Sequence, residues 1–193
     1  MKALQYHIPL ELDKSFIIFK EEGPFFPCPW HYHSEYELVL VNKSTGVRQV
    51  GDHIGYFMEG DLVLMGPSLP HLWTNDPQYF KGKANLTAEA TVIHFVENFL
   101  GKEFYNLPEI EPINNLLKLS KHGMVIRGKT RDKIAALMQE MQTMSGIQRL
   151  ASLLTIFDIL CASNEYELLA SPGYLKQGLL DCSDKFSKVN AYI

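Results

Sequence analysis

The sequence is poor in cysteine, and the three it has do not form a recognisable pattern. Cys28, Cys161 and Cys182 are widely separated, odd in number and contain no C-x-x-C pair. This excludes a disulfide framework, which requires paired cysteines at close spacing, and a zinc site built from thiolates. Buried or idle thiols in a reducing cytoplasm are the interpretation that this usage favours.

Long apolar runs and an excess of basic residues are also missing. No segment approaches the about 18 apolar residues that a membrane helix requires, and residues 1–7 lack the apolar core of a signal peptide. We therefore expect a cytoplasmic protein with no membrane contact. The chain has 18 Lys and Arg against 22 Asp and Glu, a net charge of −4. This charge argues against binding of a nucleic-acid duplex by this chain alone.

Two kinds of catalytic motif are absent as well. The sequence has no glycine-rich phosphate loop and no nucleophile motif around a serine or cysteine. What remains is the composition of a globular protein, with 46% hydrophobic and 21% charged residues. One domain, or one domain with an appendage, is the expected organisation.

The first half of the chain predicts a β-structure. Short apolar runs alternate there with turn residues, and many short strands at close spacing indicate a sandwich or barrel. The predicted strands are Ser15–Lys20, Tyr36–Val41, Arg48–Val50, Gly55–Phe57, Leu62–Met65 and Thr91–Val96.

The chain changes character near residue 97 and becomes helical. A helix is predicted over Pro112–Lys121, ended by Gly123. A second begins with Thr130 as its N-cap, and the break at Ser145-Gly146 separates it from a third with a wide apolar stripe over 150–161. The last two helices are expected to fold back on each other. Their spare apolar area would cover the barrel or a partner subunit.

The final segment has the apolar spacing of a helix that has only begun. Phe186, Val189, Tyr192 and Ile193 fit one helix face, and the chain ends there without a cap. We expect residues 184–193 to open the first helix of a following domain.

Potential metal ligands are densest in the segment from Trp30 to Glu37. If the strand at 36–41 extends back through it, His31, His33, Glu35 and Glu37 share one face. Two imidazoles and a carboxylate on one face can converge on a divalent metal. His71 is the best candidate for a fourth ligand. Glu35 would replace Glu37 if a bulge shifted the register.

Two motifs here resemble those of the cupin barrels. His31-x-His33-x3-Glu37 matches the first cupin motif, and Gly60-Asp61-x4-Gly66-x-Ser68-x-Pro70-His71 is similar to the second. The resemblance implies a cupin-like double-stranded β-helix, or jelly-roll barrel, with His31, His33, Glu37 and His71 as ligands of Zn, Ni, Mn or Fe. The chain departs from the family where Gly66 and Ser68 stand in place of proline and glycine. The alternative is a barrel whose pocket keeps these polar side chains without a metal.

The larger pattern resembles the N-terminal regulatory half of AraC-family transcription regulators. A barrel over residues 1–97, then "NFLGKEFYNLPEI", then a helical hairpin within 98–183 covers nearly the whole chain. The resemblance implies an effector-binding domain, a homodimer formed through the hairpin, and helix-turn-helix units beyond residue 193. DNA would be bound only through that following domain, so no DNA-binding residue is expected in this chain. The hairpin could instead pack only on its own barrel.

Aromatic residues near the motifs are candidates for a pocket wall, because small effectors, sugars among them, stack on such rings. Trp30, Tyr56 and Trp73 are the ring candidates for ligand binding, beside His31, His33, Glu37 and His71. Trp73 is the strongest of the rings, since it lies on the face of His71 if that strand continues. His7, His53, His94 and His122 have no comparable neighbours in the sequence and are interpreted as surface or core residues.

The leading hypothesis from the sequence is thus a non-enzymatic sensor of a small molecule, for example a sugar, that controls a DNA-binding half. The alternative is a small metal-dependent cupin enzyme of dioxygenase or isomerase type, with the same four ligands and open metal positions for substrate. The long helical extension weighs against the enzyme.

Overall fold

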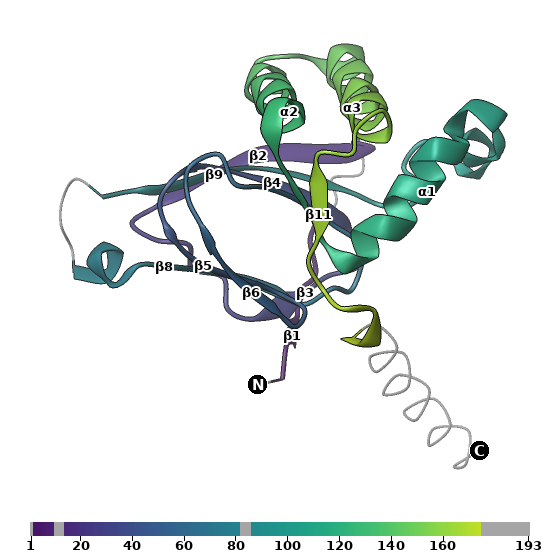
Figure 1. Cartoon of the computed structure of the whole chain (residues 1–193). Helices are drawn as coiled ribbons and strands as arrows, with labels where there is room; N and C mark the ends of the chain where they lie inside the picture. Colours follow the sequence, from purple (N-terminus) through teal and green to yellow (C-terminus); the bar gives the residue numbers. More distant parts are fainter. Residues whose placement is uncertain (1, 10–13, 82–85, 175–193) are drawn as a thin grey trace.

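The computed structural model describes residues 2–9, 14–81 and 86–174, which form two facing β-sheets with helices on the outer side of one (Figure 1). The smaller sheet contains, in spatial order, β1 (Leu4–Gln5), β3 (His31–Tyr32), β8 (His71–Asn75), β5 (Gly46–Val50) and β6 (His53–Phe57). The larger sheet contains β11 (Tyr166–Leu168), β10 (Met124–Ile126), β7 (Leu62–Met65), β4 (Tyr36–Lys43), β9 (Ala88–Phe95) and β2 (Phe16–Gly23). The described strands pair antiparallel except β1 with β3.

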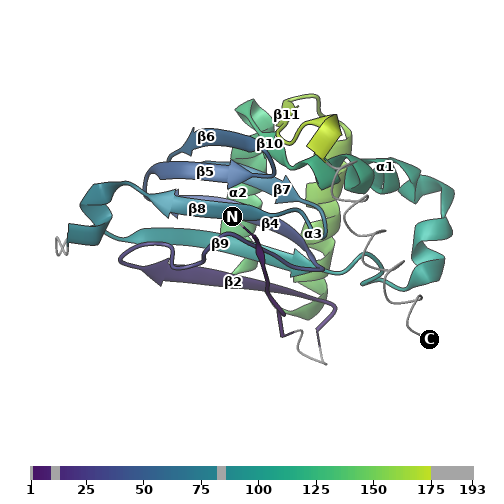
Figure 2. The same ribbon diagram turned by 90° about the horizontal axis from the view of Figure 1, so that it is seen from below.

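The barrel predicted from the short strands is confirmed. Each of the six strand ranges predicted from the sequence overlaps a strand, and β7 has the predicted bounds. Turn residues separate these strands because their conformations suit reversals; Gly60, for example, adopts φ +84° between β6 and β7. Figure 2 looks onto the smaller sheet, with β5, β6 and β8 in front and the helices α2 and α3 behind the larger sheet.

The helical second half is confirmed in outline. It contains α1 (Glu111–Leu119), α2 (Gly128–Met141) and α3 (Gly146–Cys161), together with short 3₁₀ turns. These turns are η2 (Lys102–Asn106), η3 (Pro108–Ile110) and η4 (Ser120–His122), and a further one, η1 (Pro77–Lys81), lies in the barrel. The helices α2 and α3 fold back on each other around Ser145, as expected (Figure 1).

The predicted helix start at Thr130 is wrong. The helix α2 begins at Gly128, with Arg127 as N-cap, so that Thr130 lies inside the first turn. Glu165, distant in sequence, accepts hydrogen bonds from the backbone N–H (2.8 Å) and the hydroxyl (2.7 Å) of Thr130. A carboxylate from another segment therefore satisfies the free N–H group that a local cap would otherwise serve.

The second half also contributes strands to the barrel. The strands β10 and β11 extend the larger sheet beyond β7. Residues 98–174 are thus joined to the barrel by backbone hydrogen bonds as well as by side-chain packing. The predicted helix at 184–193, and Cys182, lie outside the described residues. No helix in the described ranges is long and apolar enough to cross a membrane.

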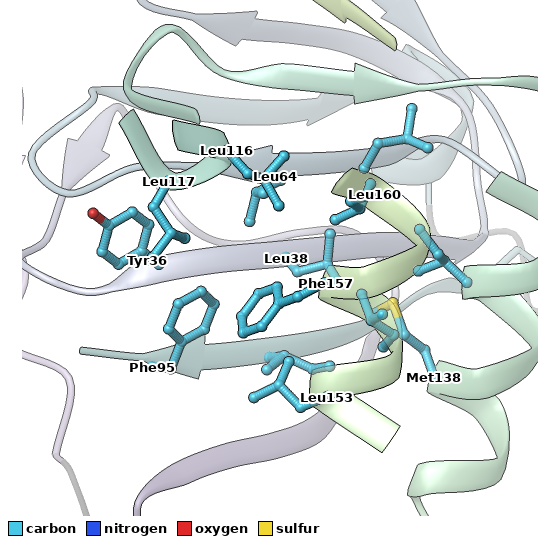
Figure 3. Packing of buried hydrophobic residues seen from close by; sticks show 14 of the residues in the cluster. Tyr36, Leu38, Leu64, Phe95, Leu116, Leu117, Met138, Leu153, Phe157 and Leu160 are labelled. Atoms are coloured by element: carbon cyan, nitrogen blue, oxygen red, sulfur yellow. The ribbon is translucent and has the colours of Figure 1, made fainter. Parts of the chain in front are cut away.

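The central strands β4 and β9 have two buried faces. Leu38 and Phe95 point to the helices, where they pack with Phe157 of α3 (Figure 3). Val39 and Val92, their neighbours in the sheet, belong to the second cluster, between the two sheets. Since side chains alternate along a strand, one wall separates the barrel interior from the helical layer.

A buried ion pair joins the two sheets. Arg48 on β5 lies 3.1 Å (Nε to Oδ2) from Asp61, which precedes β7, and both residues are buried. Burial raises the pKa of Asp61, and the Arg48 charge opposes that rise. Breaking such a pair from one side would leave an uncompensated charge in the interior.

Candidate functional site

A cavity of about 460 Å³ lies between the sheets and contains the ligand candidates. Its wall includes His31, His33, Glu37 and His71 with Trp73, the ring expected beside His71. The remaining lining residues are Tyr6, Ile8, Phe19, Lys20, Glu21, Glu22, Phe26, Cys28, Val39, Ala90, Val92 and His94. The wall is thus mostly apolar with a few convergent polar groups, as in small-molecule sites.

Two cross-strand pairs and one connecting residue form the polar part of this cavity. In the smaller sheet, His31 of β3 is paired with His71 of β8. In the larger sheet, Glu37 of β4 is paired with His94 of β9. His33 lies between β3 and β4, where the chain passes from one sheet to the other. The two sheets therefore bring five polar side chains to one place.

The predicted continuous strand through His31 and Glu37 is wrong in one respect. The strand β3 ends at Tyr32 and belongs to the smaller sheet, whereas β4 begins at Tyr36 in the larger one. The ligand candidates come together because the sheets face each other, and alternation along one strand is not the reason. Glu37, rather than Glu35, lies among the other ligand candidates.

Glu37 is the centre of the cluster. Its Oε2 lies 2.9 Å from Nε2 of His33 and 3.1 Å from Nε2 of His71, and its Oε1 lies 3.2 Å from Nε2 of His94. The His33 contact has hydrogen-bond geometry. The Nε2 atoms of His71 and His94 are buried and form no hydrogen bond within the part of the chain that the structure describes.

Backbone carbonyls fix the other ring nitrogen of three histidines. The Nδ1–H of His31 donates to Pro29 (2.8 Å), that of His71 to Leu69 (2.8 Å), and that of His33 to the carbonyl of Glu35 (3.2 Å). For His31 and His71, a neutral ring held this way has its lone pair on Nε2, the tautomer of a metal ligand with an outer-shell hydrogen bond. His33 is the exception, because its Nε2 is hydrogen-bonded to Glu37. At His71 the Nε2 lone pair faces a carboxylate, and a cation between them would relieve the repulsion.

The electrostatics of the cluster follow from burial and from Glu37. Although burial alone would raise it, His71 and the hydrogen bond from His33 hold the pKa of Glu37 well below its usual value. Burial lowers the pKa of His33, but the hydrogen bond to Glu37 more than offsets this and raises it. Burial, with His71 nearby, lowers the pKa of His31 to about 4. At neutral pH the cluster therefore holds an ionised Glu37 and a neutral His31.

The low pKa of His31 predicts a pH dependence of stability. Between pH 6.5 and about 4 the unfolded chain protonates this side chain and the folded chain does not. Stability should therefore decrease as the pH falls through this window. The full shift corresponds to about 3 kcal/mol, which partial exposure to solvent reduces to roughly 2 kcal/mol for this residue. Urea unfolding across this pH range would show that the free energy of unfolding decreases less on acidification in His31→Gln than in the wild type. Equal pH dependence in the two proteins would contradict the assignment.

The donor set fits a divalent metal. Two groups of three buried side chains have ligand atoms within 4.8 Å of one another: His31 with His33 and His71, and His33 with Glu37 and His94. They share His33. Imidazole and carboxylate donors suit Zn, Ni, Mn and Fe. The first group contains three of the four predicted ligands, and the second adds His94, which was not predicted as a ligand.

Two residues predicted to line the ligand pocket do not line it, and one residue given no functional role lies in the cluster. Tyr56 is 82% exposed on β6 and does not line the cavity. Trp30 is half-buried and is also absent from the cavity wall. His94, interpreted from the sequence as a residue without functional neighbours, is buried against Glu37. Its position in β9, directly opposite Glu37 in the register, places it there.

Cys28 lines the same cavity. Burial, with Glu21 and Glu37 nearby, raises the pKa of its thiol to about 11. The thiol is therefore protonated at neutral pH, which makes it a poor nucleophile and a poor metal ligand. This agrees with the idle role expected from the sequence.

Solved structures share this architecture at low sequence identity. The AraC-like transcriptional activator CuxR aligns with 82% of this chain and 55% of its own, with a TM-score of 0.50 and 10% identity. Apo ToxT K231A from Vibrio cholerae aligns with 78% of this chain and 55% of its own (TM-score 0.45, 13% identity). A cupin 2 conserved barrel domain protein from Salinispora arenicola CNS-205 aligns with 48% of this chain and 74% of its own (TM-score 0.37, 16% identity).

These neighbours bear on the fold. The chain has a cupin-like β-fold with a helical part, and the AraC-like transcriptional activator CuxR is among the proteins of similar structure. It spans about half the length of the two regulators. No family model matches the sequence, and neither does any curated protein.

Proposed function

We propose that this chain is the effector-binding domain of an AraC-type transcription regulator. The barrel and helices together match a large part of CuxR, described as an AraC-like transcriptional activator, and this supports the fold on which the proposal rests. The effector would occupy the cavity lined by His33, Glu37 and Trp73. Its mixed wall suits a small molecule with both polar groups and an apolar or ring face, such as a carbohydrate.

The observation that carries the proposal is the two-faced wall formed by β4 and β9. Glu37 and His94 point into the cavity from the same strands that present Leu38 and Phe95 to the helices. A ligand that favours one arrangement of these strands would also favour one packing of α2 and α3. Coupling between the two faces is what a sensor requires, since the ligand must bind one state better than the other.

The outward side of α2 and α3 would deliver the signal. We infer that this helical pair forms a homodimer interface and that a DNA-binding part outside these 193 residues responds to it. Ile147, at the start of α3, is 77% exposed, which leaves apolar surface available on that side.

A metal would be held mainly by His31, His33 and His71, with Glu37 and His94 as the second group. When bound, a divalent metal would act there as a Lewis acid and coordinate an oxygen of the effector. The protein would orient the imidazoles through the carbonyls of Pro29 and Leu69 and exclude water through the apolar wall.

Elemental analysis of the purified protein tests the metal. We expect near-stoichiometric Zn, Ni, Mn or Fe, and its loss in the variant His31→Ala/His71→Ala. The matched control is His7→Ala/His53→Ala, which removes two histidines that do not line the cavity. No metal after incubation with divalent ions would reject the metal centre and leave the cavity as a polar effector site, to be screened by thermal shift.

The convergence of buried imidazoles also keeps the metal-dependent enzyme as a second candidate. The two functions differ in the fate of the ligand. A sensor releases its effector unchanged after incubation with the metal-loaded protein, whereas an enzyme of dioxygenase or isomerase type converts it. Turnover that disappears in His33→Ala would overturn the sensor in favour of the enzyme.

A further inference from the structure

A second cavity, of about 560 Å³, lies outside the barrel between β4 and the segment that leads into and includes α1. It is separate from the histidine cavity: Tyr36 lines it, whereas the next residue, Glu37, points into the barrel. The residues that matter for its chemistry are Tyr36, Glu97, Lys102, Tyr105, Lys118 and Lys121.

Two tyrosines, Tyr36 and Tyr105, line this cavity. The ring of Tyr36 stacks on Phe95, with 5.1 Å between centroids and 7° between planes, and only 1% of the residue is exposed. Figure 3 shows this ring beside Leu117, with its oxygen at the margin of the apolar cluster. Within the described residues, no hydrogen bond reaches the hydroxyl of Tyr36 or of Tyr105. A hydroxyl placed this way is available to donate to a ligand.

The charges around these hydroxyls are mostly positive. Lys102, Lys118 and Lys121 line the cavity, and none has a carboxylate oxygen within 4.0 Å among the described residues. Glu97 is the acidic residue of the lining. In a chain whose net charge is −4, three lysines around one cavity with a single carboxylate make a local positive field.

We propose that this second cavity binds a small anion through a phosphate or carboxylate group, which the three lysines neutralise and the two tyrosine hydroxyls hydrogen-bond. Burial raises the pKa of Tyr36 to about 12, so its hydroxyl remains a donor at any physiological pH. Leu117 and the tyrosine rings supply an apolar side for the rest of the molecule. Because Tyr36 packs on Phe95, an anion bound here would contact β4 from the face opposite the histidine cavity.

Titration of the whole chain with inorganic phosphate, and separately with acetate, tests this site. Amide and side-chain resonances of Tyr36, Tyr105 and Leu117 are followed by NMR, with ionic strength held constant by chloride because exposed charges are screened by salt. We expect saturable shifts confined to this cavity. Phosphate binding more tightly than acetate would identify a phosphorylated ligand, and the reverse order a carboxylate.

Single variants separate a built site from diffuse attraction. Lys118→Gln and Lys121→Gln should each weaken the binding of the preferred anion by about tenfold, since each removes a charged hydrogen bond. Tyr36→Phe, which keeps the ring on Phe95, should weaken it about three- to tenfold. Lys133→Gln, the same charge change on α2 outside the cavity, should have no effect.

The proposal fails if neither anion gives saturable shifts at millimolar concentration. It also fails if Lys133→Gln weakens binding as much as Lys118→Gln does. Glu22→Gln, at an exposed position on the wall of the other cavity, should retain the anion response, so the outcome does not depend on the proposed effector site.

Discussion

Glu37→Gln is expected to lower the free energy of unfolding by about 3–5 kcal/mol, the range for breaking a buried ion pair from one side. The carboxylate is buried and lies within 3.2 Å of the imidazoles of His33, His71 and His94. A neutral amide of nearly the same volume leaves the packing in place but removes the carboxylate that raises the pKa of His33. Urea unfolding at neutral pH measures the loss.

The matched control for this variant is Glu22→Gln. Glu22 also lines the cavity, but its ion pair with Lys20 is exposed to solvent. An exposed pair of this kind contributes at most about 1 kcal/mol. Comparable losses in the two variants would contradict the central place given to Glu37.

Phe157→Ala is expected to cost about 3–5 kcal/mol of unfolding free energy, because it removes a large buried ring from the core. Phe157 is 2% exposed and meets Phe95 edge-on, with 5.4 Å between ring centroids (Figure 3). It therefore joins α3 to β9. The variant should also weaken any response of α3 to a ligand in the histidine cavity.

Ile147→Ala provides the comparison on the same helix. Ile147 is 77% exposed, so its truncation should change stability by less than about 0.5 kcal/mol. Thermal or urea unfolding of both variants gives the answer. If Phe157→Ala cost no more unfolding free energy than Ile147→Ala, the contact of Phe157 with Phe95 would not hold α3 on the barrel.

Much of the barrel could be predicted because its central strands alternate or run apolar between turn residues, as at Leu62–Met65. The two-residue strand β3 could not, since His31 and Tyr32 have no pattern of their own and are placed by pairing with β1 and β8. The strand β10 lies between two helices, and its three apolar residues fit a helix or a strand equally well.

The candidate site was predictable where the ligands are close in sequence. It was not predictable where strand pairing brings distant residues together. The spacing of His31, His33 and Glu37 was sufficient to propose a metal site, and His71 followed from the second motif. His94 faces Glu37 only because β4 and β9 pair in one particular register. Alternation within Thr91–Val96 puts His94 on the face of Val92, but a single sequence does not tell which strand lies opposite.

The aromatic residues of the cavity could likewise be predicted only in part. Trp73 shares a face with His71 because both lie on β8, two residues apart, and it lines the cavity. Tyr56 was a candidate by proximity in sequence alone. On β6 its side chain points to the outer surface, while the adjacent Phe57 points inward and is buried. A one-residue difference in strand position therefore decides whether a ring faces the interior or the outer surface.

We propose that the histidine cavity and the helical pair are coupled through β4 and β9. Hydrogen exchange of the backbone amides, measured with and without saturating Zn²⁺, tests this coupling, with His33→Ala as the variant that should not respond. We expect slower exchange in β4 and β9 and, with them, in α2 and α3. Slower exchange confined to the cavity strands, with α2 and α3 unchanged, would contradict it.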